Sequence, residues 1–496
     1  MAGLLLALGS IQIASAHTPG AAQNGGYVPP QSDLNPLPAF DLAATPIDAA
    51  PVQQNREPPL EPTPRARCGR GSHPLGGMQG RVPASAIDSA EGARGWTCNL
   101  SLVAQHDTPG GWRTWRYIDR RGHTCAFYDT SLPQPLTNLR LGAGPSPGVA
   151  VLDMSDPEHP AQTATLTSLP MLSPHESLNL NRRRGLLAAN MGNGLTLPGL
   201  LSIYDVNRDC RHPELLSTVA ATRFGHESGF SPDGKTYWIA GGAGLTAVDV
   251  SHPRRPRTIW SGNVYAHGLS LSPDGKRLYD AEPINGHLVI LDVSQIQARK
   301  PSPVVREISR LTWNSVTVPQ NSRWMLIDGR PYLLEFDEFG FRFSTLAPLN
   351  WVGAVRIISL ADERHPRVIS NLRLRVNQPE EHAIANEDPA PLPAPFFNYS
   401  AHYCAIPRAV NPEIVACSFI NSGLRVFNIE DPRHPREVAY FIAPTHTSSG
   451  RQPNAAFSQP AFAPARREVW YTDATGGFFV LRLSRAAWRH PTGPPR

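Results

Sequence analysis

HESGFSPDGKTYWIAGGAGLTAVDVSHPRRP, residues 226–256, contains the pattern from which the fold can be predicted. Within it, Ser-Pro-Asp-Gly-Lys at 231–235 is a turn sequence, because Pro presets φ and Gly accepts positive φ between two strands. A second, Gly-rich turn separates the next strand from the alternating apolar run LTAVDV. A Pro-rich connection then leads to a short outer strand. These residues therefore predict a unit of four antiparallel strands.

This unit recurs along the chain. Its third strand is a Gly-led apolar run, usually closed by Asp or Asn before a Pro-rich turn. Seven copies of this strand, the last one degenerate, begin 42 to 70 residues apart, at Gly148, Leu200, Gly244, Gly286, Gly353, Gly423 and Gly476. A four-stranded unit repeated about seven times predicts an all-β fold, a seven-bladed β-propeller, in which radial repetition limits exposed sheet edges.

The blades can be placed on the sequence from these copies. The innermost strands are predicted to begin near Thr97, His175, His226, His267, Asn314, His402 and Gln459. The seventh blade lacks an outer strand after residue 483, and we predict that residues 80–88 supply it and close the ring.

The third strand, read as LxVxDVSDPxxP, resembles the LVIVD-repeat family of bacterial secreted propellers. The resemblance covers about residues 96–484 and implies the propeller fold. It implies no particular activity, because the same fold carries many unrelated functions.

The flanking segments complete the predicted organisation. Residues 1–16 contain an apolar run that ends in Ala-Ser-Ala, which is typical of a signal peptide. Residues 17–66 are Pro-rich and aperiodic, which favours a flexible segment. Residues 67–95 are predicted to close the ring, 96–486 to form the propeller and 487–496 to form a C-terminal tail. We therefore expect a periplasmic or secreted protein.

The six cysteines fit an oxidising compartment, although six cysteines allow fifteen pairings. Strand adjacency favours a Cys404–Cys417 disulfide first and Cys98–Cys125 next. Cys68 and Cys210 are left over by this scheme.

Composition excludes some partners. The net charge is only +5 over 496 residues, and no run of Lys and Arg is interleaved with aromatic residues, so nucleic acid is not expected as a partner. No later stretch is apolar enough for an integral membrane segment. The oligomeric state is not predicted.

Histidines mark one end of the predicted channel. Aligning the innermost strands puts His175, His226, His267 and His402 at one equivalent position, where seven strands converge. A strand does not itself require His there. Converging imidazoles can bind a divalent transition metal such as Cu, Fe or Zn, and these four residues are the predicted metal ligands.

Two carboxylates follow two of these histidines in a repeated His-Glu-Ser triplet. Glu176 and Glu227 could add an oxygen ligand, orient a ring or act as a base, and they are the predicted catalytic residues. The alternative is structural, because a Gly-His at the start of an inner strand can be a hydrogen-bonding device that duplication has copied.

Two functions remain open at this point. The first is a metal-dependent oxidoreductase, lyase or hydrolase acting on a small, partly apolar substrate beneath the long loops at 328–353 and 376–403. Aromatic residues that could cover the channel there are Tyr332, Phe336, Phe339, Phe341, Trp351, Phe396, Phe397 and Tyr399. The second is a non-catalytic binding or scaffolding propeller of the cell envelope, which would hold no metal.

Overall fold

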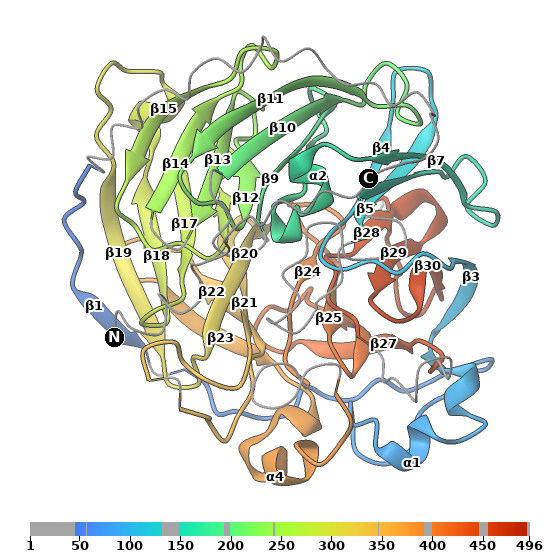
Figure 1. Cartoon of the computed structure of the whole chain (residues 1–496). Helices are drawn as coiled ribbons and strands as arrows, with labels where there is room; N and C mark the ends of the chain where they lie inside the picture. The colour runs from blue at the N-terminus through green and yellow to red at the C-terminus, as the bar shows by residue number, and fades with distance from the viewer. Residues whose placement is uncertain are drawn as a thin grey trace, which may run out of the picture. The chain divides into compact units, whose positions relative to one another are not determined.

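The computed structural model describes residues 45–55, 57–130, 148–192, 199–241, 244–345, 347–390, 399–445 and 455–493. These residues form seven sheets arranged around a central axis (Figure 1), which confirms the predicted all-β, seven-bladed propeller. The predicted signal peptide, residues 1–16, lies outside the described residues, as does the segment 17–44. No helix among the described residues is both long and apolar enough to span a membrane.

Blades are numbered along the chain, and their strands are given from the channel outward. Blade 1 is β4 (Thr114–Ile118), β5 (Thr124–Asp129), β6 (Val149–Asp153) and β7 (Ala161–Leu166). Blade 2 is β8 (Asn179–Asn181), β9 (Leu186–Asn190), β10 (Gly199–Asp205) and β11 (Glu214–Thr222). Blade 3 is β12 (Ser228–Phe230), β13 (Thr236–Gly241), β14 (Gly244–Asp249) and β15 (Arg257–Gly262).

Two of the remaining four blades, blades 4 and 6, have an additional fifth strand. Blade 4 is β16 (Leu269–Leu271), β17 (Arg277–Glu282), β18 (His287–Asp292) and β19 (Arg306–Trp313), extended by β1 (Val52–Asn55). Blade 5 is β20 (Val318–Ile327), β21 (Arg330–Glu338), β22 (Val355–Ser359) and β23 (Arg367–Leu372). Blade 6 is β24 (Cys404–Ala405), β25 (Ile414–Phe419), β26 (Gly423–Asn428) and β27 (Arg436–Ile442), extended by β2 (Trp96–Cys98). Blade 7 is β28 (Ala461–Ala463), β29 (Glu468–Asp473), β30 (Gly477–Leu483) and β3 (Leu100–His106).

Helices are short and lie in the connections. They are α1 (Ala84–Ile87), α2 (Leu169–Leu172), α3 (Ser294–Gln297) and α4 (His382–Ala385), with single 3₁₀ turns η1 (Gly92–Arg94), η3 (His175–Ser177), η4 (Arg375–Asn377), η5 (Pro379–Glu381) and η6 (Pro464–Arg466).

The core lies between neighbouring blades. Trp238 and Leu245 of blade 3, for example, belong to the same buried cluster as Leu278 and Val289 of blade 4. Because both faces of a blade pack against other blades, its second and third strands are apolar on both sides. This is why β26 is buried at each of its positions.

The two turn types of the repeat form as predicted. In 231–235, Gly234 has φ +70° and the Asp233 carboxylate accepts hydrogen bonds from Ser231 Oγ (2.6 Å) and the Lys235 amide (3.0 Å). In the outer Pro-rich turns an exposed histidine contacts the aspartate three residues earlier, for instance His434 Nδ1 with Asp431 at 2.8 Å. These outer histidines therefore close turns.

The innermost strand of blade 1 differs from the one predicted by the sequence alignment. Thr97 was predicted to begin an innermost strand, but β2 is an extra outer strand that pairs with β27, and the inner strand of blade 1 is β4. The chain from 96 to 106 looks like one strand in sequence. Asn99, however, has φ +56°, and its side-chain amide donates to the carbonyls of Arg67 (2.9 Å) and Val438 (2.8 Å), so the chain changes sheets there.

Ring closure also differs from the prediction. The seventh blade does lack its own outer strand, but β3 supplies it by pairing antiparallel with β30. Residues 80–88, predicted for that role, instead contain α1. In blade 5 the inner strand begins at Val318 rather than near Asn314.

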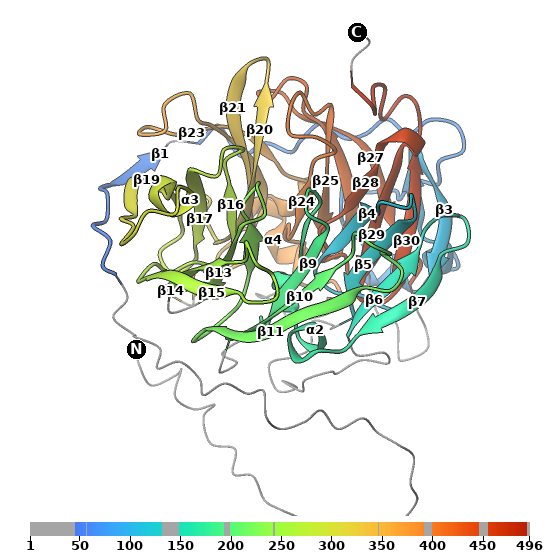
Figure 2. The same ribbon diagram turned by 90° about the horizontal axis from the view of Figure 1, so that it is seen from above.

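Part of the Pro-rich segment that was predicted to be flexible, residues 45–55 and 57–66, is described, and it contacts the propeller. Strand β1 pairs parallel with β19 at the outer edge of blade 4, as Figure 2 shows from the side. Further along, the Thr63 amide donates to the Arg373 carbonyl at 2.8 Å. An open sheet edge offers unpaired backbone groups, and an extended segment without its own structure can satisfy them.

Three disulfides are present: Cys404–Cys417, Cys68–Cys98 and Cys125–Cys210. The first confirms the prediction, since these residues are directly opposed on β24 and β25. The predicted Cys98–Cys125 pair is wrong because β2 belongs to blade 6 and not to blade 1. Cys98 instead ties the chain before the propeller to blade 6, and Cys125–Cys210 links blades 1 and 2.

Candidate functional site

Four histidines gather at one end of the channel. His226, His267 and His402 each lie just before an inner strand, and His175 lies in η3. The ring centroids of His175 and His226 are 4.7 Å apart, and those of His226 and His267 are 4.9 Å apart. The structure thus brings together all four histidines that the sequence placed at equivalent positions.

The carboxylate of Glu176 lies among them. Its Oε2 is 3.2 Å from His226 Nε2 and 3.4 Å from His267 Nε2, and its Oε1 is 3.1 Å from His402 Nε2. Only 1% of the Glu176 side chain is exposed. Three imidazoles from three blades therefore aim the same ring nitrogen at one buried carboxylate.

The opposite ring nitrogen of each of these imidazoles is fixed by the backbone of an adjacent blade. His226 Nδ1 contacts the Gly192 carbonyl at 3.0 Å, His267 Nδ1 the Pro319 carbonyl at 2.9 Å and His402 Nδ1 the Phe457 carbonyl at 2.7 Å. A carbonyl can only accept, so each Nδ1 carries the proton. Nε2 then faces the axis, as in histidines whose second nitrogen is oriented for a metal.

His175 differs from the other three. It was predicted to begin an inner strand, but Pro174 precedes it and it opens a 3₁₀ turn with φ +48°. Its Nδ1 is buried without a hydrogen-bond partner among the described residues, 3.7 Å from Glu176 Oε2. Its ring packs on Trp112, with centroids 4.1 Å apart.

Two further polar residues at the cluster were not anticipated. Glu338, at the end of β21, places Oε1 3.5 Å from His267 Nε2 and Oε2 3.3 Å from His402 Nε2. Gln320 of β20 donates from its amide to Glu176. One feature of the sequence pointed to blade 5 as a source of other polar groups: it has no histidine at the equivalent position, where Asn314 was aligned instead.

Glu227 lies apart from the imidazoles. Its carboxylate accepts from the Arg113 guanidinium and the Asn321 amide, and it is fully buried. A Cβ on Gly268 would collide with this carboxylate, so only glycine leaves room for it. Arg113 also donates to Tyr403 Oη at 3.2 Å. This group is a polar layer beneath the cluster, and we call Arg113, Glu227, Asn321 and Tyr403 the channel plug.

The cluster is strongly coupled electrostatically. Burial acts to raise the pKa of Glu176, but the surrounding imidazoles outweigh it and hold the pKa well below its usual range. Burial acts to lower the pKa of His267 and His402, yet hydrogen bonding to Glu176 and the charge of Glu338 raise each to about 9. Burial lowers the pKa of His175 to about 3. Burial raises the pKa of Glu227 to about 7, against the opposing charge of Arg113.

The site opens on the side of His175 and His226, whose side chains are 17% and 25% exposed, while His402 is fully buried. Aromatic rings surround it: Trp112 lies 5.3 Å from His402 between ring centroids, and Phe457 lies 5.4 Å from it.

The predicted aromatic lid is only partly located there. Phe339 directly follows Glu338 and stacks on Phe341, with centroids 5.0 Å apart. Tyr332, Phe336 and Tyr399, also predicted to cover the channel, are buried in the core between blades 5 and 6. Phe396 and Phe397 lie outside the described residues.

Two sets of donor atoms, which share Glu176, are each close enough to hold an ion. In the set His175, Glu176 and His226, and in the set Glu176, Glu338 and His402, one ligand atom from each residue lies within 4.8 Å of the others. A third set, Asp119, His123 and Asp209, lies at the outer rim. There Asp119 accepts backbone amides, including Cys210 at 2.9 Å, and acts as a turn closure.

Fold and site together define an all-β, seven-bladed propeller with a buried His/Glu cluster in its channel. No family model matches the chain, and no curated protein matches it significantly. Among solved structures, the β-propeller domain of Cps50 (Swd1) from Myceliophteria thermophila is 12% identical over 78% of this chain and 100% of its own, with a TM-score of 0.49.

Two other solved structures are similar at the same level. The periplasmic gluconolactonase PpgL of Pseudomonas aeruginosa is 15% identical over 69% of this chain and 94% of its own, with a TM-score of 0.46. A chain of the mitotic checkpoint complex is 12% identical over 78% and 93%, with a TM-score of 0.48. At such identities the likeness concerns the fold alone.

Proposed function

We propose that this protein is a metal-dependent enzyme whose centre is the His/Glu cluster. His175, His226, His267 and His402 supply nitrogen ligands, and Glu176 supplies an oxygen ligand, to a Cu, Fe or Zn ion. When bound, such an ion acts as a Lewis acid or lowers the pKa of a water molecule.

One observation carries the proposal: three imidazoles donate Nδ1–H to backbone carbonyls and turn Nε2 toward one carboxylate on the channel axis. A purely structural histidine at the start of a strand needs only the carbonyl contact. Three second nitrogens that converge on Glu176 from three blades are not needed to start a strand, whereas a metal requires such convergence.

Charge balance supports the same assignment. With pKa values near 9, His267 and His402 are both protonated at neutral pH and offset Glu176 and Glu338. A divalent ion that displaces these two protons leaves the net charge of the buried cluster unchanged. The two carboxylates therefore already compensate the charge that a buried divalent ion would bring.

We propose unequal roles for the carboxylates, including Glu338, which the sequence analysis did not name beside Glu176 and Glu227. Glu338 contacts two imidazoles of the cluster and is followed by the aromatic residues Phe339 and Phe341, so it is placed to move a proton at the substrate. Glu227 is held by Arg113 in the channel plug, and we propose a positioning role for it.

The substrate is proposed to be small and partly apolar. It would enter on the side of His175 and His226, between Trp112 and the Phe339–Phe341 pair. Whether the reaction is that of an oxidoreductase, a lyase or a hydrolase depends on the metal bound. Three disulfides are typical of an oxidising compartment, in keeping with a periplasmic or secreted enzyme.

The test is elemental analysis of purified protein and of His226→Ala, His267→Ala and His402→Ala, with His434→Ala as the matched control. His434 lies in an exposed outer turn beside Asp431, far along the blade from the channel. We expect near-stoichiometric metal in the wild type and the control and a loss of most of it in the other three. Metal-free wild-type protein that stays metal-free after incubation with Cu, Fe and Zn would favour the non-catalytic binding or scaffolding propeller.

A further inference from the structure

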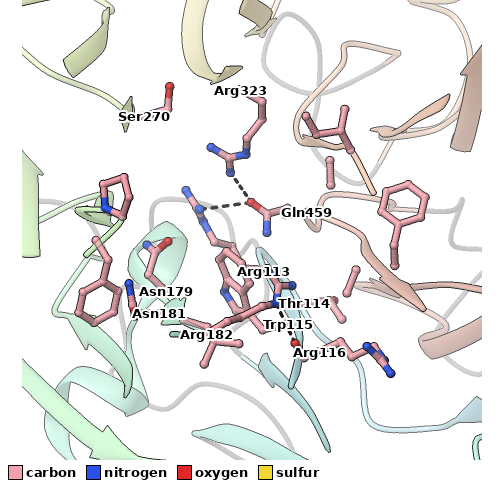
Figure 3. A pocket seen from close by; sticks show the side chains of 18 of the residues that line it. Arg113, Thr114, Trp115, Arg116, Asn179, Asn181, Arg182, Ser270, Arg323 and Gln459 are labelled. Atoms are coloured by element: carbon pink, nitrogen blue, oxygen red, sulfur yellow. Dashed lines mark hydrogen bonds between the residues drawn. The ribbon is translucent and has the colours of Figure 1, made fainter. Parts of the chain in front are cut away.

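The channel contains a cavity on the far side of the channel plug from the His/Glu cluster. It has a volume of about 630 Å³ and is lined by residues of all seven blades (Figure 3). Among the described residues, no aspartate or glutamate lines it, whereas five arginines do: Arg113, Arg116, Arg182, Arg183 and Arg323.

The channel plug neutralises one of these arginines, since Arg113 contacts Glu227 as described above. Arg323 instead donates to neutral groups, Asn321 Oδ1 at 3.0 Å and the Gln459 side chain. Burial, together with the charge of Arg113, lowers the pKa of Arg323 to about 10, and the charge of Glu227 offsets this only in part.

Arg116 and Arg182 lie side by side. The Nε of Arg182 donates to the Arg116 carbonyl at 3.3 Å. The Arg182 guanidinium lies over the ring of Trp115, 5.6 Å from its centroid. The Arg116 guanidinium lies over the ring of Trp470, also at 5.6 Å. No carboxylate lies within 4.0 Å of either guanidinium in the described part of the chain. Glu468, which acts on Arg116 at longer range, is itself paired with Arg466 and Arg482.

Unused donors lie in the same lining. Arg116 Nε and Thr114 Oγ1 are buried and have no hydrogen-bond partner within the described ranges, and Thr114 is fully buried. Buried donors of this kind are costly unless a partner satisfies them. A cleft lined by one charge sign also concentrates ions of the opposite sign, and here Arg182 and Arg183 are exposed to solvent.

We propose that this cavity is a second ligand site that binds a small oxyanion carrying at least two negative charges, through phosphate or carboxylate groups. Guanidinium groups pair with both kinds of group in a bidentate manner. The cavity is walled by inner strands, so a small anion fits it better than an acidic chain does. The site is independent of the metal proposal, because the channel plug separates the two.

Binding is tested by calorimetry with pyrophosphate and with citrate, at an ionic strength held constant with NaCl. The test variant is Arg116→Gln/Arg182→Gln, and Arg255→Gln is the control that removes a charge from an exposed outer turn. We expect binding to the wild type and the control, and a Kd at least about tenfold weaker for the test variant. Equal affinity in all three proteins, or no binding to the wild type, would overturn the proposal.

Two further measurements distinguish anion binding in this cavity from chelation at the His/Glu cluster and from a structural role of the arginines. His226→Ala should bind pyrophosphate as the wild type does, since chelation of a metal by the anion requires the other site. Without added anion, Arg116→Gln/Arg182→Gln should melt no lower than the wild type, because it removes uncompensated charge; a much lower melting temperature would make these arginines structural. If only polyglutamate binds and neither small anion does, the small-anion proposal is wrong.

Discussion

At the level of single residues, the two members of the repeated His-Glu-Ser triplet have diverged. In blade 3 it is His226 that reaches the axis, and Glu227 turns toward Arg113. In blade 2 the 3₁₀ turn at His175 shifts the chain so that Glu176 occupies the centre of the cluster. The same three residues therefore place Glu176 at the centre of the cluster in blade 2, whereas in blade 3 the glutamate is turned away and only the histidine reaches the cluster.

This divergence predicts opposite effects of two substitutions. His226→Ala should lose most of the bound metal and change the free energy of unfolding by less than a core truncation, which costs about 2–5 kcal/mol. Glu227→Gln should keep the metal but lose about 1–3 kcal/mol, because the buried Arg113 loses its charged acceptor. Metal stoichiometry and urea unfolding of both variants check this. Unchanged metal with a large loss of stability in His226→Ala would mean that the histidine is structural.

Metal uptake should depend on pH in a defined direction. Because the pKa values of His267 and His402 are raised to about 9, both rings are protonated below that pH and the metal must displace the protons. We expect release of roughly two protons per ion at pH 7 and an apparent affinity that rises up to about 100-fold per pH unit until pH 9. Calorimetry in buffers of different ionisation enthalpy counts the protons. Release of none would contradict the assignment of these two ligands.

At the level of strands and their connections, two of the three disulfides, Cys68–Cys98 and Cys125–Cys210, join segments that the repeat itself does not join. Cys125–Cys210 spans 85 residues and links two blades, whereas Cys404–Cys417 spans 13 residues within one hairpin. The former thus constrains the unfolded chain over a much longer loop.

The disulfides should therefore differ in their contribution to stability. On the chain-entropy account, replacing Cys125 and Cys210 by Ser should cost about 4–5 kcal/mol, and replacing Cys404 and Cys417 about 3 kcal/mol. Guanidinium unfolding of the two double variants under non-reducing conditions measures this order. The reverse order would show that packing around the hairpin disulfide outweighs loop closure.

In the molecule as a whole, the ring is closed by a strand from the beginning of the propeller. Strand β3 covers the edge of β30, and without it the apolar strand β30 would present an open edge. Open apolar edges lead to aggregation.

Closure can be tested by two shortened chains that differ only in this strand. A chain that begins at residue 99 retains β3, and one that begins at residue 109 lacks it, while both lack β1 and β2. We expect a single cooperative unfolding transition in the first, and aggregation or a broad transition in the second, by calorimetry and light scattering. Similar cooperative melting of both chains would show that blade 7 is stable with three strands.

The repeated unit, the number of blades, the hairpin disulfide and the set of histidines at one end of the channel could all be predicted from the amino-acid sequence. These features depend on local patterns: an Asp-Gly turn, an apolar run and a His at the same place in each unit. Strand period and turn chemistry act over a few residues, so they can be recognised without knowing what lies across the ring.

The way the ring closes, and the side chains that meet inside it, could be seen only in the folded molecule. The turn at Asn99 sends β2 and β3 to different blades, and this depends on carbonyl groups of Arg67 and Val438. Glu338 and Gln320 likewise come from blade 5 to histidines of other blades, and the arginines of the cavity come from blades 1, 2 and 5. Seven strands converge on one axis, so side chains up to 346 residues apart, such as Arg113 and Gln459, become neighbours there, and no local pattern records those contacts.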